Sequence, residues 1–297
     1  MSSDRSEAQP VLRFAPSPNG PLHLGHAYSA LLAFDTARKL GGRFLLRIED
    51  IDPGRSRQEF VDGIYDDLRW LGLAWEMPVL RQSRHIGDYV AAAEHLMTMG
   101  VLYRCFATRA EIMAAHAASP RPLDPEGAPV YPGLHKALSD GEATRRIRVG
   151  EAFAMRLDVE RAMALVRAKL GGAPLDFVEC DEHFRPRRIA ADPLRWGDVV
   201  IQRKDVSTSY HLSVVVDDAR QGITHIVRGR DLYAATDIHR LLQVLLDLPE
   251  PVYHHHRLIA DASGQKLAKS AGAPGLRQLR AQGLSPDDIR RLAGLGK

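Results

Sequence analysis

The stretch VLRFAPSPNGPLHLGHAYSALLAFDTARKLGGRFLLRI, residues 11–48, indicates the fold class. Residues 11–15 are typical of a short buried strand, and the prolines and glycine that follow predict a loop. From His26 onward, apolar residues recur every three or four positions, which predicts a helix that ends at the glycine pair 41–42. Residues 43–48 form the next predicted strand. This βαβ unit implies an α/β fold with a parallel sheet.

Two more helices are predicted directly after this unit. The first follows Ser56, where Ser56 and Glu59 have the spacing of a capping box. The second runs from about Arg84 to Met99, with Ser83 as the expected N-cap.

The middle of the chain differs in texture from the parts on either side. From about residue 102 to residue 193, prolines and arginines cluster, which indicates an inserted subdomain of mixed α+β structure. The expected divisions are a first catalytic half, the insertion, a second catalytic half and a basic C-terminal segment, at residues 1–101, 102–193, 194–250 and 251–297.

The second catalytic half is expected to return to alternating elements. Residues 198–218 resemble a pair of strands because they are rich in β-branched residues. Residues 224–229 predict a further strand, and 235–248 an amphipathic helix. Near the end of the chain, the sequence SPDD at Ser285 predicts a helix start with proline at its first position.

The composition indicates a globular protein of the cytoplasm. Apolar residues make up 45% and charged residues 26% of the chain, and no apolar run is long enough to span a membrane. The polar N-terminus lacks the apolar region of a secretory signal, and two cysteines cannot build a disulfide framework. We therefore expect a cytoplasmic protein without a membrane partner, and we expect a monomer.

Positive charge is concentrated at the C-terminal end. The net charge is +3, yet residues 264–297 alone carry seven Lys or Arg against two Asp. Such a segment fits contact with phosphate groups, although a solvated helical tail would look the same.

The sequence PLHLGH, residues 21–26, has the features of a phosphate site. It follows a predicted strand and opens a helix, whose N-terminus attracts anions. Gly25 allows close approach to the backbone, and His23 and His26 can donate hydrogen bonds to phosphate oxygens. Taken alone, these residues would equally suit an ordinary helix cap with surface histidines.

A second motif, GQKLAKS at residues 264–270, completes a pattern with the first. HLGH with a later KLAKS is similar to the paired signature of class I aminoacyl-tRNA synthetases. The blocks RFAPSPNGPLHLGHAYSALL, LLRIEDIDPGRSR and SYHLSVVVDDARQGITHIVRGRDL resemble the glutamyl branch of that family. The resemblance covers about residues 11–275 and implies a Rossmann-type parallel sheet with an inserted mixed subdomain and a short helical C-terminal segment.

The resemblance implies where ATP binds as a substrate together with Mg²⁺. His23, Gly25 and His26 would hold ATP at the mouth of the helix. Lys266 and Lys269 would close over the triphosphate, with Lys269 neutralising charge on the leaving pyrophosphate.

The resemblance also implies a binding site for L-glutamate. Two carboxylates and one ammonium call for cationic or polar clamps and one anion, and arginine suits a carboxylate because its fork binds bidentately. The implied residues are Arg13, Ala15 through its backbone, Ser17, Glu49, Tyr210 and Arg228. Singly, each could be a surface ion pair or a core residue, and which arginine meets which carboxylate stays open.

A zinc site is not favoured. Relatives that bind zinc do so through a Cys-x-Cys pair, a Tyr and a later Cys, whereas this chain has Cys105, Ala107, Tyr131 and His135 at those positions. Three imperfect ligands remain where structural zinc takes four, so we predict no zinc. The run HHH, residues 254–256, is interpreted as structural or as a contact to the ATP side of the site.

The short C-terminal segment narrows the expected function. Only 27 residues follow Ser270, fewer than an anticodon-binding portion requires. The chain in this respect resembles shortened paralogues of glutamyl-tRNA synthetase. The resemblance implies activation of glutamate with ATP in the absence of tRNA, followed by transfer to the queuosine base in the anticodon loop of tRNA(Asp). A truncated enzyme that charges tRNA(Glu) and a non-catalytic tRNA-binding protein are the alternatives.

Overall fold

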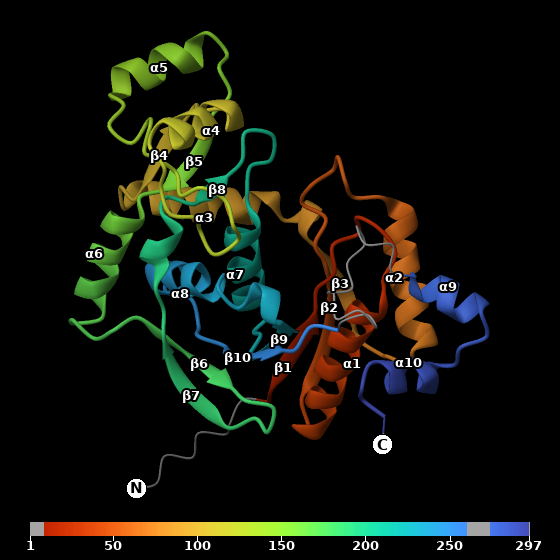
Figure 1. Ribbon diagram of the computed structural model, residues 1–297. Helices are drawn as coiled ribbons and strands as arrows, with labels where there is room; N and C mark the ends of the chain where they lie inside the picture. The colour runs from red at the N-terminus through yellow and green to blue at the C-terminus, as the bar shows by residue number, and fades with distance from the viewer. Residues whose placement is uncertain (1–8, 260–273, 297) are drawn as a thin grey trace, which may run out of the picture.

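Parallel strands form the first part of the central sheet. The computed structural model describes residues 9–259 and 274–296. β1 (Val11–Phe14), β2 (Arg43–Ile48) and β3 (Glu76–Arg81) pair in parallel in the order β1-β2-β3 (Figure 1). The predicted strands at 11–15 and 43–48 are thereby confirmed.

Four further strands form a second hydrogen-bonded set. β10 (Val252–His256) pairs in parallel with β9 (His225–Gly229) and with β6 (Asp176–Cys180), and β7 (Pro186–Ala190) lies antiparallel to β6.

β1 and β9 join the two sets of strands. They lie side by side, and the Thr224 N–H donates to the Val11 carbonyl at 3.0 Å. The parallel strands therefore follow the spatial order β3-β2-β1-β9-β10-β6, which is the Rossmann-type arrangement. In such sheets ligands bind outside the carboxyl ends of the strands, at the point where the strand order reverses. Here that point lies between β1 and β9.

α1 (Leu24–Lys39) crosses the sheet beside this point and contacts β1, β2 and β9. It starts two residues before the predicted position, because His23 is the N-cap. Gly41, with a φ of +62°, follows its C-cap as expected.

The expected cap of the second helix is wrong. α2 (Gln58–Trp70) begins after Arg57, whose side chain makes no capping hydrogen bond. Ser56 and Glu59 therefore do not form a capping box. The Ser56 N–H instead donates to the Asp52 carbonyl at 2.9 Å, because the chain turns tightly after β2.

The expected cap of the third helix is wrong as well. α3 (Ile86–Thr98) follows a 3-10 turn, η1 (Gln82–Arg84), and its N-cap is His85. The N–H of Ser83 and its hydroxyl both donate to the Asp50 carboxylate, at 2.8 Å each. Ser83 thus ties the turn to the end of β2.

The prediction of a strand pair over residues 198–218 is half wrong. β8 (Val200–Gln202) is a strand, but residues Tyr210–Arg220 form helix α7. Strand propensity of the valine run is overruled by tertiary contacts. As a helix, the segment buries Leu212 and Val215 in the apolar core and directs Asp217 and Asp218 toward buried arginines.

A smaller antiparallel sheet, in the order β4-β5-β8, lies above the main sheet in Figure 1. Its other strands are β4 (Leu102–Cys105) and β5 (Ala154–Leu157), and the helices of this region are α4 (Arg109–Ala118), α5 (Asp140–Arg148) and α6 (Val159–Lys169). The pairing of the strands does not follow the expected division at residue 193. β6 and β7, which precede it, pair with strands of the main sheet, and β8, which follows it, pairs with the small sheet. The domain boundaries stay a prediction.

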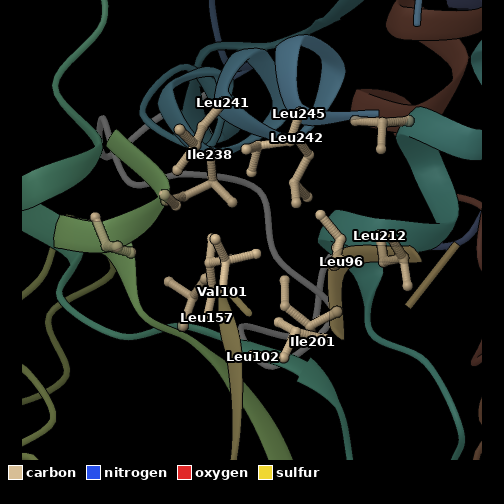
Figure 2. Packing of buried hydrophobic residues seen from close by; sticks show 14 of the residues in the cluster. Leu96, Val101, Leu102, Leu157, Ile201, Leu212, Ile238, Leu241, Leu242 and Leu245 are labelled. Atoms are coloured by element: carbon tan, nitrogen blue, oxygen red, sulfur yellow. The ribbon is translucent and has the colours of Figure 1, made fainter. Parts of the chain in front are cut away.

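A large apolar core connects the small sheet to the main body. Figure 2 shows side chains of α8 (Thr236–Leu245) facing those of β4, β5, β8, α3 and α7. Leu241, Leu242, Leu157 and Ile201 are fully buried there. The predicted helix at 235–248 and the predicted strand at 224–229 are confirmed by α8 and β9.

Two short helices close the C-terminal end, α9 (Leu276–Ala281) and α10 (Pro286–Leu292). Ser285 caps α10 and proline follows it directly, as predicted. The remaining turns are η2 (Pro193–Trp196) and η3 (Arg230–Leu232). Within the described residues, no helix combines the length and the apolar character that crossing a bilayer requires.

Candidate active site

A pocket of about 650 Å³ lies at the reversal point of the sheet. Its walls come from the ends of β1, β2 and β9, the start of α1 and the start of α7. All the predicted site residues in the described ranges line it, namely Arg13, Ala15, Ser17, His23, Gly25, His26, Glu49, Tyr210 and Arg228. Lys266 and Lys269 lie outside the described residues.

The two histidines at the start of α1 have defined proton positions. Nδ1 of His23 accepts a hydrogen bond from the Gly25 N–H at 3.1 Å, and Nδ1 of His26 accepts one from the His23 N–H at 3.1 Å. An accepting nitrogen carries no proton, so in the neutral ring the proton is on Nε2. Nε2 is therefore the donor atom of each imidazole, which is what phosphate oxygens require.

Gly25 is needed for this arrangement. A Cβ atom at this position would lie 3.0 Å from Cε1 and 3.1 Å from Nδ1 of His23. The expectation was that Gly25 admits a ligand close to the backbone. In the structure, the ring that comes so close is that of His23 itself.

Both ends of the segment that contains the lysine motif lie beside the start of α1. Ile259 packs against Tyr28 of α1. Gly275 forms a β-bridge with His23, and the Leu276 N–H donates to the Leu22 carbonyl at 2.7 Å.

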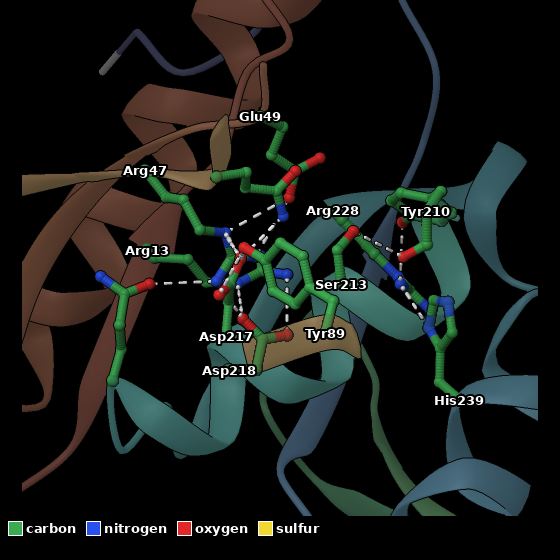
Figure 3. A network of polar contacts seen from close by, with 12 residues as sticks. Arg13, Arg47, Glu49, Tyr89, Tyr210, Ser213, Asp217, Asp218, Arg228 and His239 are labelled. Atoms are coloured by element: carbon green, nitrogen blue, oxygen red, sulfur yellow. Dashed lines mark hydrogen bonds and ion pairs between the residues drawn. The ribbon is translucent and has the colours of Figure 1, made fainter. Parts of the chain in front are cut away.

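A buried network of charges holds one wall of the pocket (Figure 3). Arg13 donates to both carboxylate oxygens of Asp218, at 2.9 and 3.2 Å. Arg47, which is fully buried, donates to Asp218 at 2.7 Å and to Oε1 of Glu49 at 3.1 Å. Asp218 thus joins two arginines, and Arg47 in turn fixes Glu49 at the pocket edge.

The pKa values of this network follow from burial and pairing. Burial raises the pKa of Glu49 more than the nearby guanidinium groups of Arg47 and Arg13 lower it. For Asp218 the opposite holds, because Arg13 and Arg47 outweigh burial and hold its pKa below the ordinary value. A further cation in the pocket would therefore favour the ionised form of Glu49.

Arg228 lies on the other wall in very different surroundings. Its Nη2 donates to the Thr236 hydroxyl at 2.8 Å, its Nη1 to His239 at 3.1 Å and its Nε to His255 at 3.0 Å. Tyr210 is a more distant partner, with its hydroxyl 3.4 Å from Nη1. Among the described residues, Arg228 forms no ion pair, although it is buried.

The imidazoles around Arg228 are neutral near pH 7. Burial, together with the positive charge of Arg228, lowers the pKa of His211 to about 4. The pKa of His239 is also held well below its ordinary value by burial and by Arg228. The charge of Arg228 is therefore left for an anion that enters the pocket.

Sequence reasoning missed several residues of these two walls. They are Arg47, Glu179, Asp217, Asp218 and His239. A buried charge or imidazole has no local sequence signal, since its role depends on which strands become neighbours. The acidic pair in VVVDD was a signal, but the segment was interpreted as a strand.

The residues at the expected zinc position do not fit a metal ion. The Cys105 thiol lies 3.2 Å from the Tyr131 hydroxyl, which also accepts a hydrogen bond from the His135 N–H at 3.1 Å. The Arg156 guanidinium lies 4.0 Å from the centre of the Tyr131 ring, so a cation already occupies that side. Nowhere in residues 9–259 and 274–296 do three His, Cys, Asp or Glu side chains gather as a metal site would need.

The three adjacent histidines have separate structural roles. Nδ1 of His254 lies 3.0 Å from the Cys180 carbonyl. His255 contacts Arg228, and His256 lines the pocket, with its Nε2 3.0 Å from the Ser29 hydroxyl. The interpretation of this run as structural and as part of the pocket wall agrees with these contacts.

Most of the chain matches one protein-family model. Residues 10–291 match the model of class I tRNA synthetases (E and Q), catalytic domain. The chain belongs to this family. A class I tRNA synthetase is a ligase that uses ATP as a substrate, and the pocket between β1 and β9 is its candidate active site.

The similar class I synthetases include proteins that this chain covers over their whole length and proteins that are longer than this chain. The glutamyl-Q tRNA(Asp) synthetase of Rhodobacter capsulatus is 48% identical over 96% of this chain and 100% of its own length. That of Nitratidesulfovibrio vulgaris is 39% identical over 93% of this chain and 83% of its own length. Glutamate–tRNA ligase 1 of Ruegeria pomeroyi is 37% identical over 92% of this chain but only 58% of its own length.

Solved structures agree with the fold. The glutamate tRNA ligase of Elizabethkingia meningosepticum, in complex with its amino acid, has a TM-score of 0.75 at 23% identity. The match covers 96% of this chain and 60% of that protein, so this chain spans well under two thirds of it. The Rossmann-type α/β fold expected from the sequence is confirmed.

Proposed function

We propose that the chain activates L-glutamate with ATP and transfers it to the queuosine base in the anticodon loop of tRNA(Asp). The observation that carries the proposal is a single pocket with two unlike walls. One wall presents histidine donors at a helix N-terminus, and the other presents Arg228, which pairs with no carboxylate of residues 9–259 and 274–296. The name and full-length match of the Rhodobacter relative support the choice of tRNA.

Glutamate would occupy the wall formed by β1, β2 and β9. Arg228, with the Tyr210 hydroxyl beside it, would bind a carboxylate, because a buried guanidinium without a counter-ion favours an anionic partner. Glu49 would receive the ammonium group. Arg13, Ser17 and the backbone of Ala15 would complete the enclosure on the β1 side.

ATP would bind at the start of α1. His23 and His26 offer Nε2 donors there, and the helix dipole favours the negative phosphates. Lys266 and Lys269 would add positive charge from the segment that begins after Ile259 and ends before Gly275. Mg²⁺ would enter with the triphosphate.

The enzyme would position the two substrates and stabilise developing charge, and no side chain would act as a nucleophile. The glutamate carboxylate attacks the α-phosphorus, pyrophosphate leaves, and glutamyl-adenylate forms. Lysine and histidine donors stabilise the charge that develops on the phosphoryl oxygens. A hydroxyl of the queuosine base then attacks the activated carbonyl, and AMP leaves.

One experiment separates this function from its alternatives. Purified protein is given labelled glutamate and ATP with tRNA(Asp) that carries queuosine, with tRNA(Asp) that lacks it, and with tRNA(Glu). We expect transfer only to the first. Transfer to tRNA(Glu) would instead indicate a truncated charging enzyme, and binding of tRNA without any transfer would indicate a non-catalytic protein.

A further inference from the structure

A buried carboxylate reaches Arg228 through one imidazole. Oε2 of Glu179 lies 2.8 Å from Nδ1 of His255, and Nε2 of His255 lies 3.0 Å from Nε of Arg228. His255 and Arg228 are direct neighbours in the register of β10 and β9, and Glu179 lies on β6, on the other side of β10. Their exposed fractions are only 5%, 7% and 4% for Glu179, His255 and Arg228.

The direction of every hydrogen bond in this chain of contacts is fixed by Arg228. A guanidinium can only donate, so Nε2 of His255 accepts and carries no proton. The ring proton is then on Nδ1 and is donated to Glu179. The other oxygen of Glu179 accepts the backbone N–H of His255 at 3.2 Å, so the carboxylate holds both the ring and its backbone.

The neutral state of His255 is consistent with its environment. Burial is the main cause that lowers the pKa of His255 to about 4, with Arg228 adding to it and Glu179 opposing it. At pH 7 the ring therefore accepts from Arg228 without adding a positive charge next to it.

The contrast with Arg13 shows what the interposed imidazole achieves. Asp218 takes two N–H groups of Arg13 directly, which neutralises much of the charge of that guanidinium. Arg228 donates to the His255 ring instead, and the Glu179 carboxylate contacts the far side of that ring and not Arg228 itself. Arg228 is thus oriented while its charge stays available to a ligand.

We propose that Glu179 and His255 are positioning residues that orient Arg228 toward the side-chain carboxylate of the bound amino acid and so favour glutamate over glutamine. The inference rests on the proposed activation of glutamate. It adds a residue of β6, outside the recognised motifs, to the specificity of the pocket. A carboxylate ligand gains from an oriented, unpaired guanidinium, whereas a neutral amide gains much less.

The test compares three variants in ATP–pyrophosphate exchange without tRNA. Two of the variants are Glu179→Gln and His255→Gln, which keep side chains of similar size. Each disrupts the hydrogen bonds that run from Glu179 through the His255 ring to Arg228. We expect the KM for glutamate to rise about tenfold or more in both variants. Each variant loses a hydrogen bond that orients the charged residue in contact with the ligand. The KM for ATP should stay within about twofold, and the preference for glutamate over glutamine should fall.

His254→Gln is the matched control. His254 is the preceding residue of β10 and is similarly buried, but its Nδ1 contact is to the Cys180 carbonyl. We expect unchanged KM values for glutamate and ATP. A purely structural role of the strand would instead change both constants in all three variants, and that result would overturn the inference.

A second measurement works on the unmodified protein. In protein labelled with ¹⁵N-histidine, the His255 ring, assigned by the signal lost in His255→Gln, should be protonated at Nδ1 and not at Nε2. The opposite tautomer would contradict the inference. If the unmodified protein shows no exchange with glutamate, the proposed function fails. If it shows exchange and Glu179→Gln keeps the KM for glutamate and the selectivity, only the inference fails.

Discussion

His23 and Gly275 form an antiparallel bridge that fastens the start of α9 to the loop before α1. The Leu276 N–H reinforces it with a 2.7 Å hydrogen bond to the Leu22 carbonyl. Lys269 is six residues before Gly275 in the chain. The bridge therefore places the described end of the segment that contains Lys269 beside the start of α1.

Removing the Lys269 ammonium should slow activation of the amino acid. We expect Lys269→Ala to reduce glutamate-dependent ATP–pyrophosphate exchange at least about 100-fold, or about 3 kcal/mol, as for one lost donor to a transition state. Lys39→Ala, an exposed lysine at the end of α1, serves as the control and should leave the rate unchanged. Equal rates for Lys269→Ala and the unmodified protein would exclude the role.

Removing the Arg228 guanidinium should weaken glutamate binding. We expect Arg228→Ala to lose about 2–5 kcal/mol, since a buried carboxylate would be left without its charged partner. Titration calorimetry with glutamate measures the loss, and ATP binding should be retained. Arg230→Ala, two residues further on and exposed, is the control. An unaltered affinity for glutamate in Arg228→Ala would refute this assignment.

Asp67 should make the protein less stable as the pH rises. Its side chain is buried in α2, and burial, supported by the charge of Asp66, raises its pKa to about 6 despite Arg277 and Arg280. The folded state then binds its proton more tightly than the unfolded state, whose aspartate has a pKa of about 3.9. The free energy of unfolding should therefore fall between about pH 4 and pH 6, by about 3 kcal/mol from this group.

Urea unfolding of Asp67→Asn over this pH range checks that expectation. The substitution removes the titrating group, so this part of the decline should vanish. Asp66→Asn alters the exposed neighbour and should keep most of it. A pH dependence that is the same for Asp67→Asn and the unmodified protein would show that Asp67 is not responsible.

A chelator should not affect the inserted region. Cys105, Tyr131 and His135 fall short of a zinc site, and Arg156 already stacks on the tyrosine. We expect the same melting temperature with and without EDTA, and no zinc by elemental analysis of protein purified without added metal. Stoichiometric zinc, or a clear drop in melting temperature on chelation, would reverse this prediction.

Local patterns were sufficient to predict the first βαβ unit. The apolar periodicity after His26 and the glycines at 41–42 depend only on neighbouring residues. The same is true of Ser285, where cap and proline occur together. The resemblance to class I synthetases then indicated nine residues that line one pocket in the structure.

Contacts between distant segments were beyond sequence reasoning. The run VVVDD favours a strand by propensity, yet it becomes part of α7 because Asp217 and Asp218 meet Arg47 across the fold. Glu179 likewise reaches His255 only because β6 and β10 are neighbours. Neither partner can be identified before the strand order is known.

We expect the pocket between β1 and β9 to join glutamate to ATP. The most direct measurement is ATP–pyrophosphate exchange by the purified protein with glutamate, glutamine or aspartate and no tRNA. We expect exchange with glutamate and little or none with the other two. Absence of exchange with glutamate at millimolar concentrations would contradict it.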